Sequence, residues 1–169
     1  MEFSFALCLP RDAGTIPLAR HLCGASLRQF GAPPHSIADI ELALTEACTN
    51  VLKHGGSDHE YELLIEIGSE HCSIQVSDAG SGFDHADLRP GEESTTAEGG
   101  RGIQLMRALV DEIRFVSEAD AGTAVHLVKR LSFPEGSVMH RVVVAEGRGR
   151  AEAGMAHTEP ALESEARTG

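Results

Sequence analysis

Three polar side chains recur at helical spacing in the first third of this chain: Glu46, Asn50 and His54. Residues four apart lie one above another on the same face of a helix, so the three form one polar stripe. A carboxylate can accept a proton, and a carboxamide oxygen is a hard ligand suited to Mg²⁺. Glu46 could thus accept a proton and Asn50 could ligate a metal ion, although either residue taken singly is more often a solvated helix residue. His54 suits the C-terminal cap of the helix better than catalysis.

An apolar stripe runs beside the polar one along the same segment. Its members, at helical spacing, are Ile37, Ile40, Leu44, Ala47 and Val51. The polar stripe must then lie close to the protein core. A half-buried carboxylate beside a half-buried amide is unfavourable unless something charged binds there. The pattern predicts a ligand site on the flank of a core helix.

A glycine-containing turn follows a strand-like segment that ends at Asp78. A carboxylate at the end of a strand can accept hydrogen bonds, and Gly80 and Gly82 would let the backbone approach a flat or charged ligand. Turns of this kind are common, so the signal is weak alone. It gains meaning only in combination with the polar stripe.

A second glycine-rich segment, with Gly100, Arg101 and Gly102, opens a helical pattern. Glycines at a helix N-terminus present unpaired backbone N–H groups that bind anions, and Arg101 could add positive charge. Farther along, Thr123 begins a strand, where its hydroxyl could supply one more polar contact. These residues are candidates for an anion-binding site.

The elements that must position these residues follow from hydrophobic periodicity. Ser36 is the expected N-cap of the central helix. The predicted strands are residues 2–9, 61–67, 72–77, 113–117 and 123–131, and the predicted helices are residues 16–30, 36–54 and 103–112. This order predicts an α/β two-layer sandwich, in which one mixed β-sheet is covered by helices on one face.

Two segments lack this periodicity. Residues 78–100 are rich in Gly, Ser, Thr, Asp and Glu, which is typical of a functional lid or a disordered loop. Residues 138–144 could add a strand, but no pattern continues from Glu146 onward, which predicts a disordered tail. We expect a domain over residues 1–133 and a largely disordered C-terminal extension over residues 134–169.

Composition narrows the class of protein. The chain has 169 residues, 41% hydrophobic and 24% charged, which suits one globular domain. Its net charge of −12 repels phosphate backbones and acidic membranes, so neither nucleic acid nor a membrane is expected as a partner. No apolar run approaches the roughly 20 residues of a membrane-spanning helix, and no secretion signal is evident, so we expect a cytoplasmic location. The cysteines are widely spaced, which predicts buried free thiols.

Together, four segments resemble the nucleotide-binding domain of the GHKL superfamily, which includes gyrase, Hsp90, histidine kinases and MutL. Residues 46–55 resemble its N-box, residues 78–83 its first glycine box and residues 100–105 its second. The Gly122-Thr123 pair resembles its last conserved turn. The resemblance covers residues 3–133.

Two phrases resemble one branch of the superfamily, the anti-sigma-factor serine kinases of bacterial partner-switching systems. They are Thr-Glu-Ala-Cys-Thr-Asn at 45–50 and Gly-Arg-Gly-Ile-Gln-Leu-Met-Arg-Ala-Leu-Val-Asp at 100–111. The resemblance implies a Bergerat-type ATP-binding fold with ATP and Mg²⁺ as ligands. It also implies phosphorylation of an anti-anti-sigma partner of the STAS type, sequestration of a sigma factor, and a homodimer.

The resemblance further implies a role for each matched residue. The implied nucleotide-binding set is Asn50, Asp78, Gly80, Gly82, Gly100, Arg101, Gly102 and Thr123. In it, Asp78 would hold the adenine amino group and Asn50 would ligate Mg²⁺, while the glycines of the second box would cradle the phosphates. Glu46 would accept the proton of the partner's serine, and residues 84–99 would act as the lid. Arg20 matches an arginine that contacts protein partners in the family, although an ordinary solvated arginine is an equal alternative.

Two departures from the family pattern concern the phosphates. Gln104 stands where many members of the superfamily have glycine. The lid segment carries three glutamates against Arg89 alone, so Arg101 is the remaining candidate for a cationic contact to the γ-phosphate.

Two functions of different classes remain open at this point. The leading hypothesis is an ATP-dependent protein-serine kinase that is also an anti-sigma factor, because Glu46 is retained. The alternative is a nucleotide-gated binding module without productive phosphotransfer. A P-loop kinase is excluded, since Gly-x-x-x-x-Gly-Lys-Ser/Thr does not occur.

Overall fold

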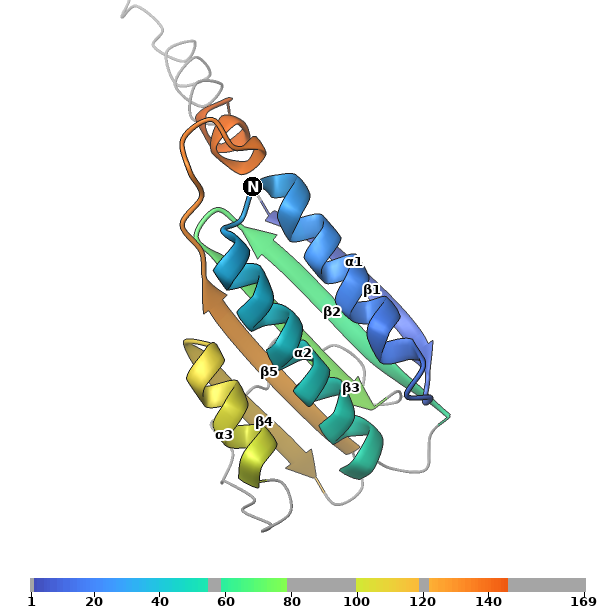
Figure 1. Cartoon of the computed structure of the whole chain (residues 1–169). Helices are drawn as coiled ribbons and strands as arrows, with labels where there is room; N and C mark the ends of the chain where they lie inside the picture. The colour runs from blue at the N-terminus through green and yellow to red at the C-terminus, as the bar shows by residue number, and fades with distance from the viewer. Residues whose placement is uncertain (1, 55–58, 79–99, 119–121, 146–169) are drawn as a thin grey trace, which may run out of the picture.

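The computed structural model describes residues 2–54, 59–78, 100–118 and 122–145. Within these ranges, strands and helices follow one another as Figure 1 shows. The elements are β1 (Glu2–Pro10), α1 (Thr15–Phe30), α2 (Pro34–His54), β2 (Glu60–Gly68), β3 (His71–Asp78), α3 (Gly100–Leu109), β4 (Glu112–Glu118) and β5 (Gly122–Arg130). A further helix, which carries no label in the figure, covers residues 138–145.

The strands form one five-stranded sheet in the order β1-β2-β3-β5-β4. Each neighbouring pair is antiparallel, so the prediction of a mixed sheet is wrong. Both β3 and β4 pair antiparallel with β5, so these two strands run in the same direction. However, β5 lies between them and pairs with both, so the parallel strands never share hydrogen bonds.

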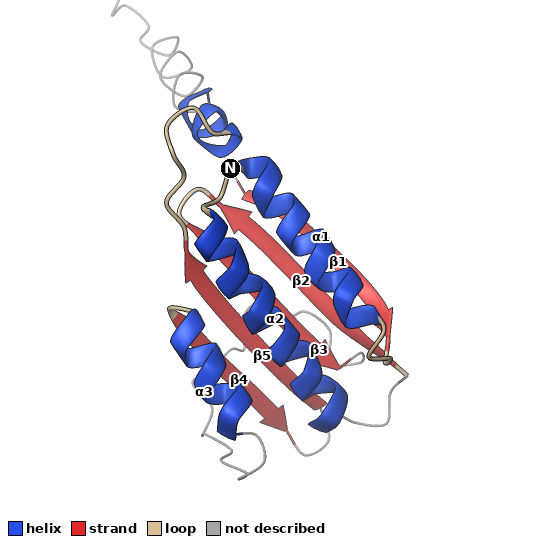
Figure 2. Ribbon diagram, in the orientation of Figure 1, coloured by secondary structure: helices blue, strands red, loops and turns tan. Residues whose placement is uncertain are grey.

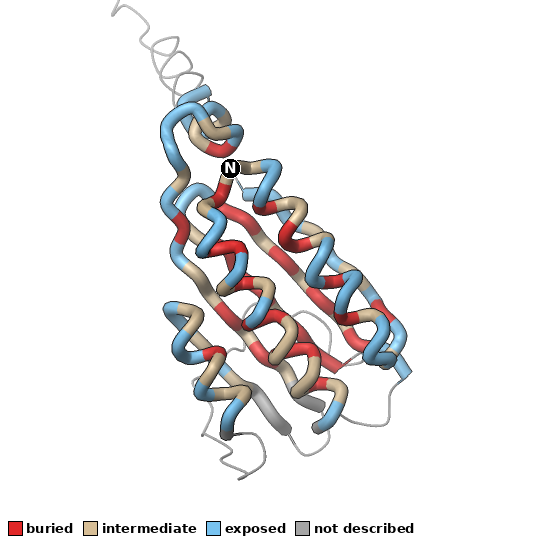
Figure 3. Tube along the Cα trace, viewed as in Figure 1, coloured by how far each residue is buried: buried red, intermediate tan, exposed pale blue. Residues whose placement is uncertain are grey.

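Helices α1, α2 and α3 lie on one face of this sheet (Figure 2), which confirms the predicted two-layer sandwich. The core lies between the layers, where buried segments of helix and strand face each other (Figure 3). On β2, for example, Tyr61, Leu63, Ile65 and Ile67 are all 0% exposed, and the residues between them are more exposed. This alternation places every second side chain of the strand under the helices.

Helix ends follow local backbone chemistry, with one difference from the prediction. Helix α1 ends at Gly31, whose φ of +85° is the left-handed conformation that favours glycine. Helix α2 begins at Pro34, so Ser36 lies inside the helix and is not its N-cap. Proline is well suited to a first helical position, because the N–H that it lacks would have no partner there.

Two other predicted elements change where packing and capping outweigh periodicity. Residues 138–145 form a helix rather than a strand. The Ser137 hydroxyl accepts a hydrogen bond from the His140 N–H at 3.2 Å, and Met139 is 2% exposed. The predicted helix 103–112 is shifted toward the N-terminus, because Glu112 belongs to β4.

The cysteines also differ in part from the expectation. Cys23, Cys48 and Cys72 are buried free thiols, as predicted, but Cys8 is exposed. Cys8 alternates along β1 with Leu7 and Leu9, so its side chain points away from the helices. In the described ranges, no helix is both long and apolar enough to span a bilayer.

Candidate nucleotide-binding and phosphotransfer site

The predicted polar stripe of α2 meets the predicted anion-binding turn of α3. A Cβ atom placed on Gly102 would lie 2.9 Å from Glu46 Oε2 and 3.9 Å from Asn50 Oδ1. Glu46 and Asn50 are both half-buried. Only glycine at position 102 therefore lets the first turn of α3 approach these two oxygens so closely. Two segments that are distant in the sequence converge on one flank of α2.

The first turn of α3 presents backbone N–H groups that have no partner within the helix. Gly100 and Gly102 belong to this turn, and Arg101 between them is exposed. The positive end of the helix dipole adds to the attraction for anions. The turn can thus hold a phosphate group beside the Glu46 carboxylate. Gln104 is exposed on the next turn.

Two contacts fix α3 in this position. Met106 is 0% exposed and anchors the helix in the core. At the other end of α3, Lys129 Nζ donates a hydrogen bond to the Leu109 carbonyl at 2.6 Å and pairs with Asp39 Oδ2 at 2.9 Å. Asp39 belongs to α2, so one ammonium group joins α3 to the helix that carries the polar stripe.

The carboxylate groups of the site differ in their surroundings. Asp78 ends β3, is 3% exposed and faces Arg11. In contrast, no other side chain in the described part of the protein donates a hydrogen bond to Glu46 or forms an ion pair with it. A half-buried acid with this arrangement is available to accept a proton or to face a bound cation.

Arg11 is the main residue of the site that sequence reasoning missed. It lies in the turn between β1 and α1, and its Nη1 is 3.4 Å from Asp78 Oδ1. Its Nη2 donates a hydrogen bond to the Val51 carbonyl at 2.6 Å. One arginine in a turn gives no sequence signal, because the residues it contacts lie on two other elements.

Tyr61 connects the strand end at Asp78 with the start of helix α1. It is 0% exposed and is the strand partner of Asp78 across β2 and β3. Its hydroxyl lies 2.9 Å from Thr15 Oγ1, and burial raises the pKa of Tyr61 to about 12. The phenol is therefore neutral at physiological pH and acts as a hydrogen-bonding group rather than an acid.

Several predicted site residues lie outside the part of the chain that the structure describes. These are Gly80, Gly82, residues 84–99, and the side chains of His54 and Thr123. The backbone of Thr123 belongs to β5 and pairs with Ser117 of β4.

Arg20 belongs to a different surface. It is exposed on α1, and α2 separates that helix from α3 (Figure 1). Arg20 is therefore not part of the cluster formed by Glu46, Asn50 and Gly102.

Comparison with known proteins agrees with this arrangement of sheet and helices. Residues 9–129 match the histidine kinase-like ATPase domain family, and the chain belongs to this family. The GHKL resemblance seen in the sequence is thereby confirmed.

Within that family, the chain is similar to proteins named serine-protein kinases. The chain is 33% identical over 136 residues to serine-protein kinase RsbW of Bacillus pumilus, covering 73% of this chain and 81% of the relative. It is 34% identical over 134 residues to serine-protein kinase RsbW of Bacillus subtilis, again covering 73% and 81%. The chain is thus a member of the serine-protein kinase branch, as its sequence phrases indicated.

A solved structure supports the fold. A crystal structure of the RsbU and RsbW domains of a Mycobacterium tuberculosis protein matches with a TM-score of 0.59 and 23% identity. The match covers 78% of this chain and 33% of that longer chain.

Proposed function

We propose that this protein is an ATP-dependent protein-serine kinase that phosphorylates an anti-anti-sigma partner of the STAS type. The observation that carries the proposal is the convergence of Gly102 with the oxygens of Glu46 and Asn50. It brings a proton acceptor, a hard oxygen ligand and a helix N-terminus together in one place. Phosphoryl transfer needs these groups, because it depends mainly on alignment and charge stabilisation.

The residues present fit both ATP and Mg²⁺. The Asn50 carboxamide oxygen would hold the metal ion, which supplies neutralisation of phosphate charge when it is bound. The N–H groups at the start of α3, with Arg101, would bind phosphate oxygens. Asp78, buried at the end of β3, would accept a hydrogen bond from the adenine amino group.

Glu46 would act on the partner's serine. Its carboxylate accepts the hydroxyl proton while the serine oxygen forms a bond to the γ-phosphorus. The bond between that phosphorus and the oxygen bridging to the β-phosphate breaks, and ADP leaves with the electron pair. General base catalysis of this kind typically contributes 10²–10⁴-fold in rate, so about that loss is expected on removing the carboxylate.

The protein's partners follow from the same family relationship. We expect sequestration of a sigma factor, a homodimer, and a cytoplasmic location. Exposed Arg20 on α1 would contact a protein partner, since it lies away from the nucleotide cluster.

The test uses γ-labelled ATP, Mg²⁺ and a purified STAS-domain partner. Wild-type protein should transfer label to a partner serine, and Glu46→Ala should bind ATP normally but transfer it roughly 10²–10⁴-fold more slowly. Glu41→Ala is the matched control, because Glu41 lies on the same helix and pairs with Arg28. An unchanged rate in Glu46→Ala would exclude this residue as the base. Tight ATP binding with no labelled partner in wild type would instead favour a nucleotide-gated binding module.

A further inference from the structure

The guanidinium group of Arg11 joins two parts of the site that belong to different elements. On one side, Nη1 lies 3.4 Å from Asp78 Oδ1, and the two side chains are only 13% and 3% exposed. An ion pair this deeply buried has a defined geometry, because little water competes for either group.

On its other side, Arg11 contacts the last turn of α2. Nη2 donates a hydrogen bond to the Val51 carbonyl at 2.6 Å and lies 3.4 Å from the Leu52 carbonyl. These carbonyls lack partners within the helix, and a cation is favourable at this negative end of the dipole. Val51 directly follows Asn50. The arginine therefore ties Asp78 to the turn that carries the expected magnesium ligand.

The backbone around Arg11 is fixed by its own contacts. The Arg11 N–H donates a hydrogen bond to the His59 carbonyl at 2.8 Å. Thr15 Oγ1 donates to the Asp12 carbonyl at 2.6 Å and contacts the Tyr61 hydroxyl at 2.9 Å. Tyr61 is also the strand partner of Asp78. The turn and the carboxylate thus share one rigid support.

We propose that Arg11 is a positioning residue for nucleotide selection, one that holds the Asp78 carboxylate in the orientation needed to recognise adenine. This inference rests on the proposed function, in which Asp78 accepts a hydrogen bond from the base. Arginine is suited to this role because its planar guanidinium group can contact a carboxylate and two carbonyls at the same time. Lysine offers a single compact ammonium.

The expected consequence is selectivity between adenine and guanine. Adenine carries an amino donor where guanine carries a carbonyl acceptor. A fixed carboxylate accepts a hydrogen bond from the former and repels the latter. If the carboxylate could rotate, it would lose the contact with ATP, whereas GTP, which never made that contact, would change little.

The experiment measures dissociation constants for Mg-ATP and Mg-GTP by calorimetry on the full chain. Arg11→Lys and Arg11→Gln should each weaken ATP binding roughly tenfold to 10²-fold, as expected for a hydrogen bond to a charged group, and GTP much less. The GTP-to-ATP ratio of the constants should fall accordingly. Arg28→Gln, which removes a surface arginine from α1, should leave the ratio unchanged. Arg11→Lys keeps the charge and carries the test if Arg11→Gln fails to fold.

A variant that is folded by thermal denaturation and keeps the wild-type ratio would overturn the inference. A merely structural role for Arg11 predicts that result, with lower stability and unchanged selectivity. Failure of the proposed function gives a different outcome, because it appears in the wild-type protein itself, either as no ATP binding or as ATP binding without transfer of label to a partner. Asp78→Asn provides the reference. Combined with Arg11→Gln it should cause less than the product of the two single losses, since both act on one contact.

Discussion

On both flanks of helix α2, a glycine of a neighbouring helix packs against a glutamate of α2, but the two contacts serve different purposes. On the flank toward α1, Gly24 lies against the carboxylate of Glu41, and a Cβ atom there would overlap it. On the flank toward α3, Gly102 lies against the carboxylate of Glu46. The two glutamates are five residues apart, which places them about 140° apart around the helix axis.

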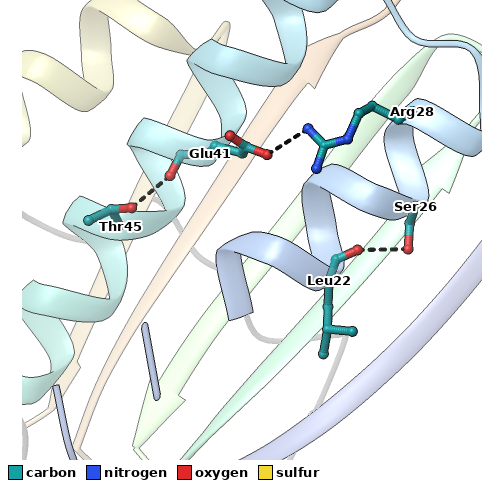
Figure 4. A network of polar contacts seen from close by, with 5 residues as sticks. All are labelled: Leu22, Ser26, Arg28, Glu41 and Thr45. Atoms are coloured by element: carbon teal, nitrogen blue, oxygen red, sulfur yellow. Dashed lines mark hydrogen bonds and ion pairs between the residues drawn. The ribbon is translucent and has the colours of Figure 1, made fainter. Parts of the chain in front are cut away.

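The α1 flank is electrostatically closed, in the sense that the protein itself supplies a counter-charge to its carboxylate. Glu41 Oε1 is 3.1 Å from Arg28 Nη1 across the gap between the two helices (Figure 4). In the same view, the hydroxyl of Thr45 donates a hydrogen bond to the Glu41 carbonyl at 2.8 Å, and that of Ser26 to the Leu22 carbonyl at 2.9 Å, each within its own helix. Polar groups on this flank are satisfied by the protein itself.

The α3 flank is electrostatically open. Within the described chain, no cation or hydrogen-bond donor from another side chain reaches Glu46 or Asn50. A glutamate next to a glycine is therefore not in itself a sign of function. What separates the two flanks is whether the protein supplies a counter-charge or leaves that place to a ligand.

One added methyl group on each flank tests whether the two flanks differ in function. Gly102→Ala would place a Cβ atom 2.9 Å from Glu46 Oε2 and force the carboxylate to move. Because misplacement of a reacting group by about 1 Å can cost 10²-fold, we expect phosphotransfer to fall by roughly 10–10²-fold. The measurement is the initial rate of partner phosphorylation.

Gly24→Ala is its matched control on the α1 flank. There, the half-exposed Glu41 side chain can swing toward solvent, and alanine is about 1 kcal/mol better than glycine within a helix. The rate should remain within about twofold of wild type. Equal rate losses in both variants would show that the flanks do not differ in function.

On the side of α2 that faces the sheet, the buried Cys48 thiol makes the stability of the protein depend on pH. Burial raises the pKa of the Cys48 thiol to about 12, from an ordinary value of 9.0. Folding thus favours the neutral thiol. Its contribution to the free energy of unfolding is fully present below about pH 9. It is lost as the pH rises toward 12, by up to about 1.4 kcal/mol per pH unit.

Urea unfolding between pH 7 and 10 measures this effect. The free energy of unfolding should decline above about pH 9, and Cys48→Ala should make the decline shallower. Exposed Cys8, replaced by serine, should leave most of the decline in place. Parallel curves for wild type and Cys48→Ala would refute the assignment to this thiol.

The smallest effect is expected from the ion pair of the closed flank. Arg28 is 51% exposed and Glu41 is 26% exposed. Exposed pairs of this kind contribute about 0.2–1 kcal/mol, so Arg28→Ala should lower the free energy of unfolding by no more than that. Urea denaturation at low and high salt measures it. A larger loss, insensitive to salt, would mean that Arg28 acts through packing of its aliphatic part.

Much of the fold was predictable because its signals are local. The alternation of Tyr61, Leu63, Ile65 and Ile67 marked β2, and each of these residues is buried. The helical repeat marked α2 and placed Glu46 and Asn50 on one flank. By contrast, the insertion of β5 between β3 and β4 could not be predicted, because strand order depends on which edge is available during packing.

The candidate site divides in the same way. The types and spacing of Glu46, Asn50 and the glycines around Arg101 were visible in the sequence. The contacts of Arg11 and Lys129 were not, since each side chain reaches elements far away along the chain. Residues 138–145 were misread because a β-branched run favours a strand, whereas capping by Ser137 and burial of Met139 favour a helix.

The order of amino acids already specifies which chemical groups the protein carries and which of them share a helix face, because backbone periodicity depends only on neighbouring residues. Packing between the helices places Glu41 beside an arginine and Glu46 beside a glycine and a helix N-terminus. The tertiary structure also brings Arg11 to Asp78. The reason is that such pairings are set by how helices and strands pack across the sheet, and no local pattern encodes that packing.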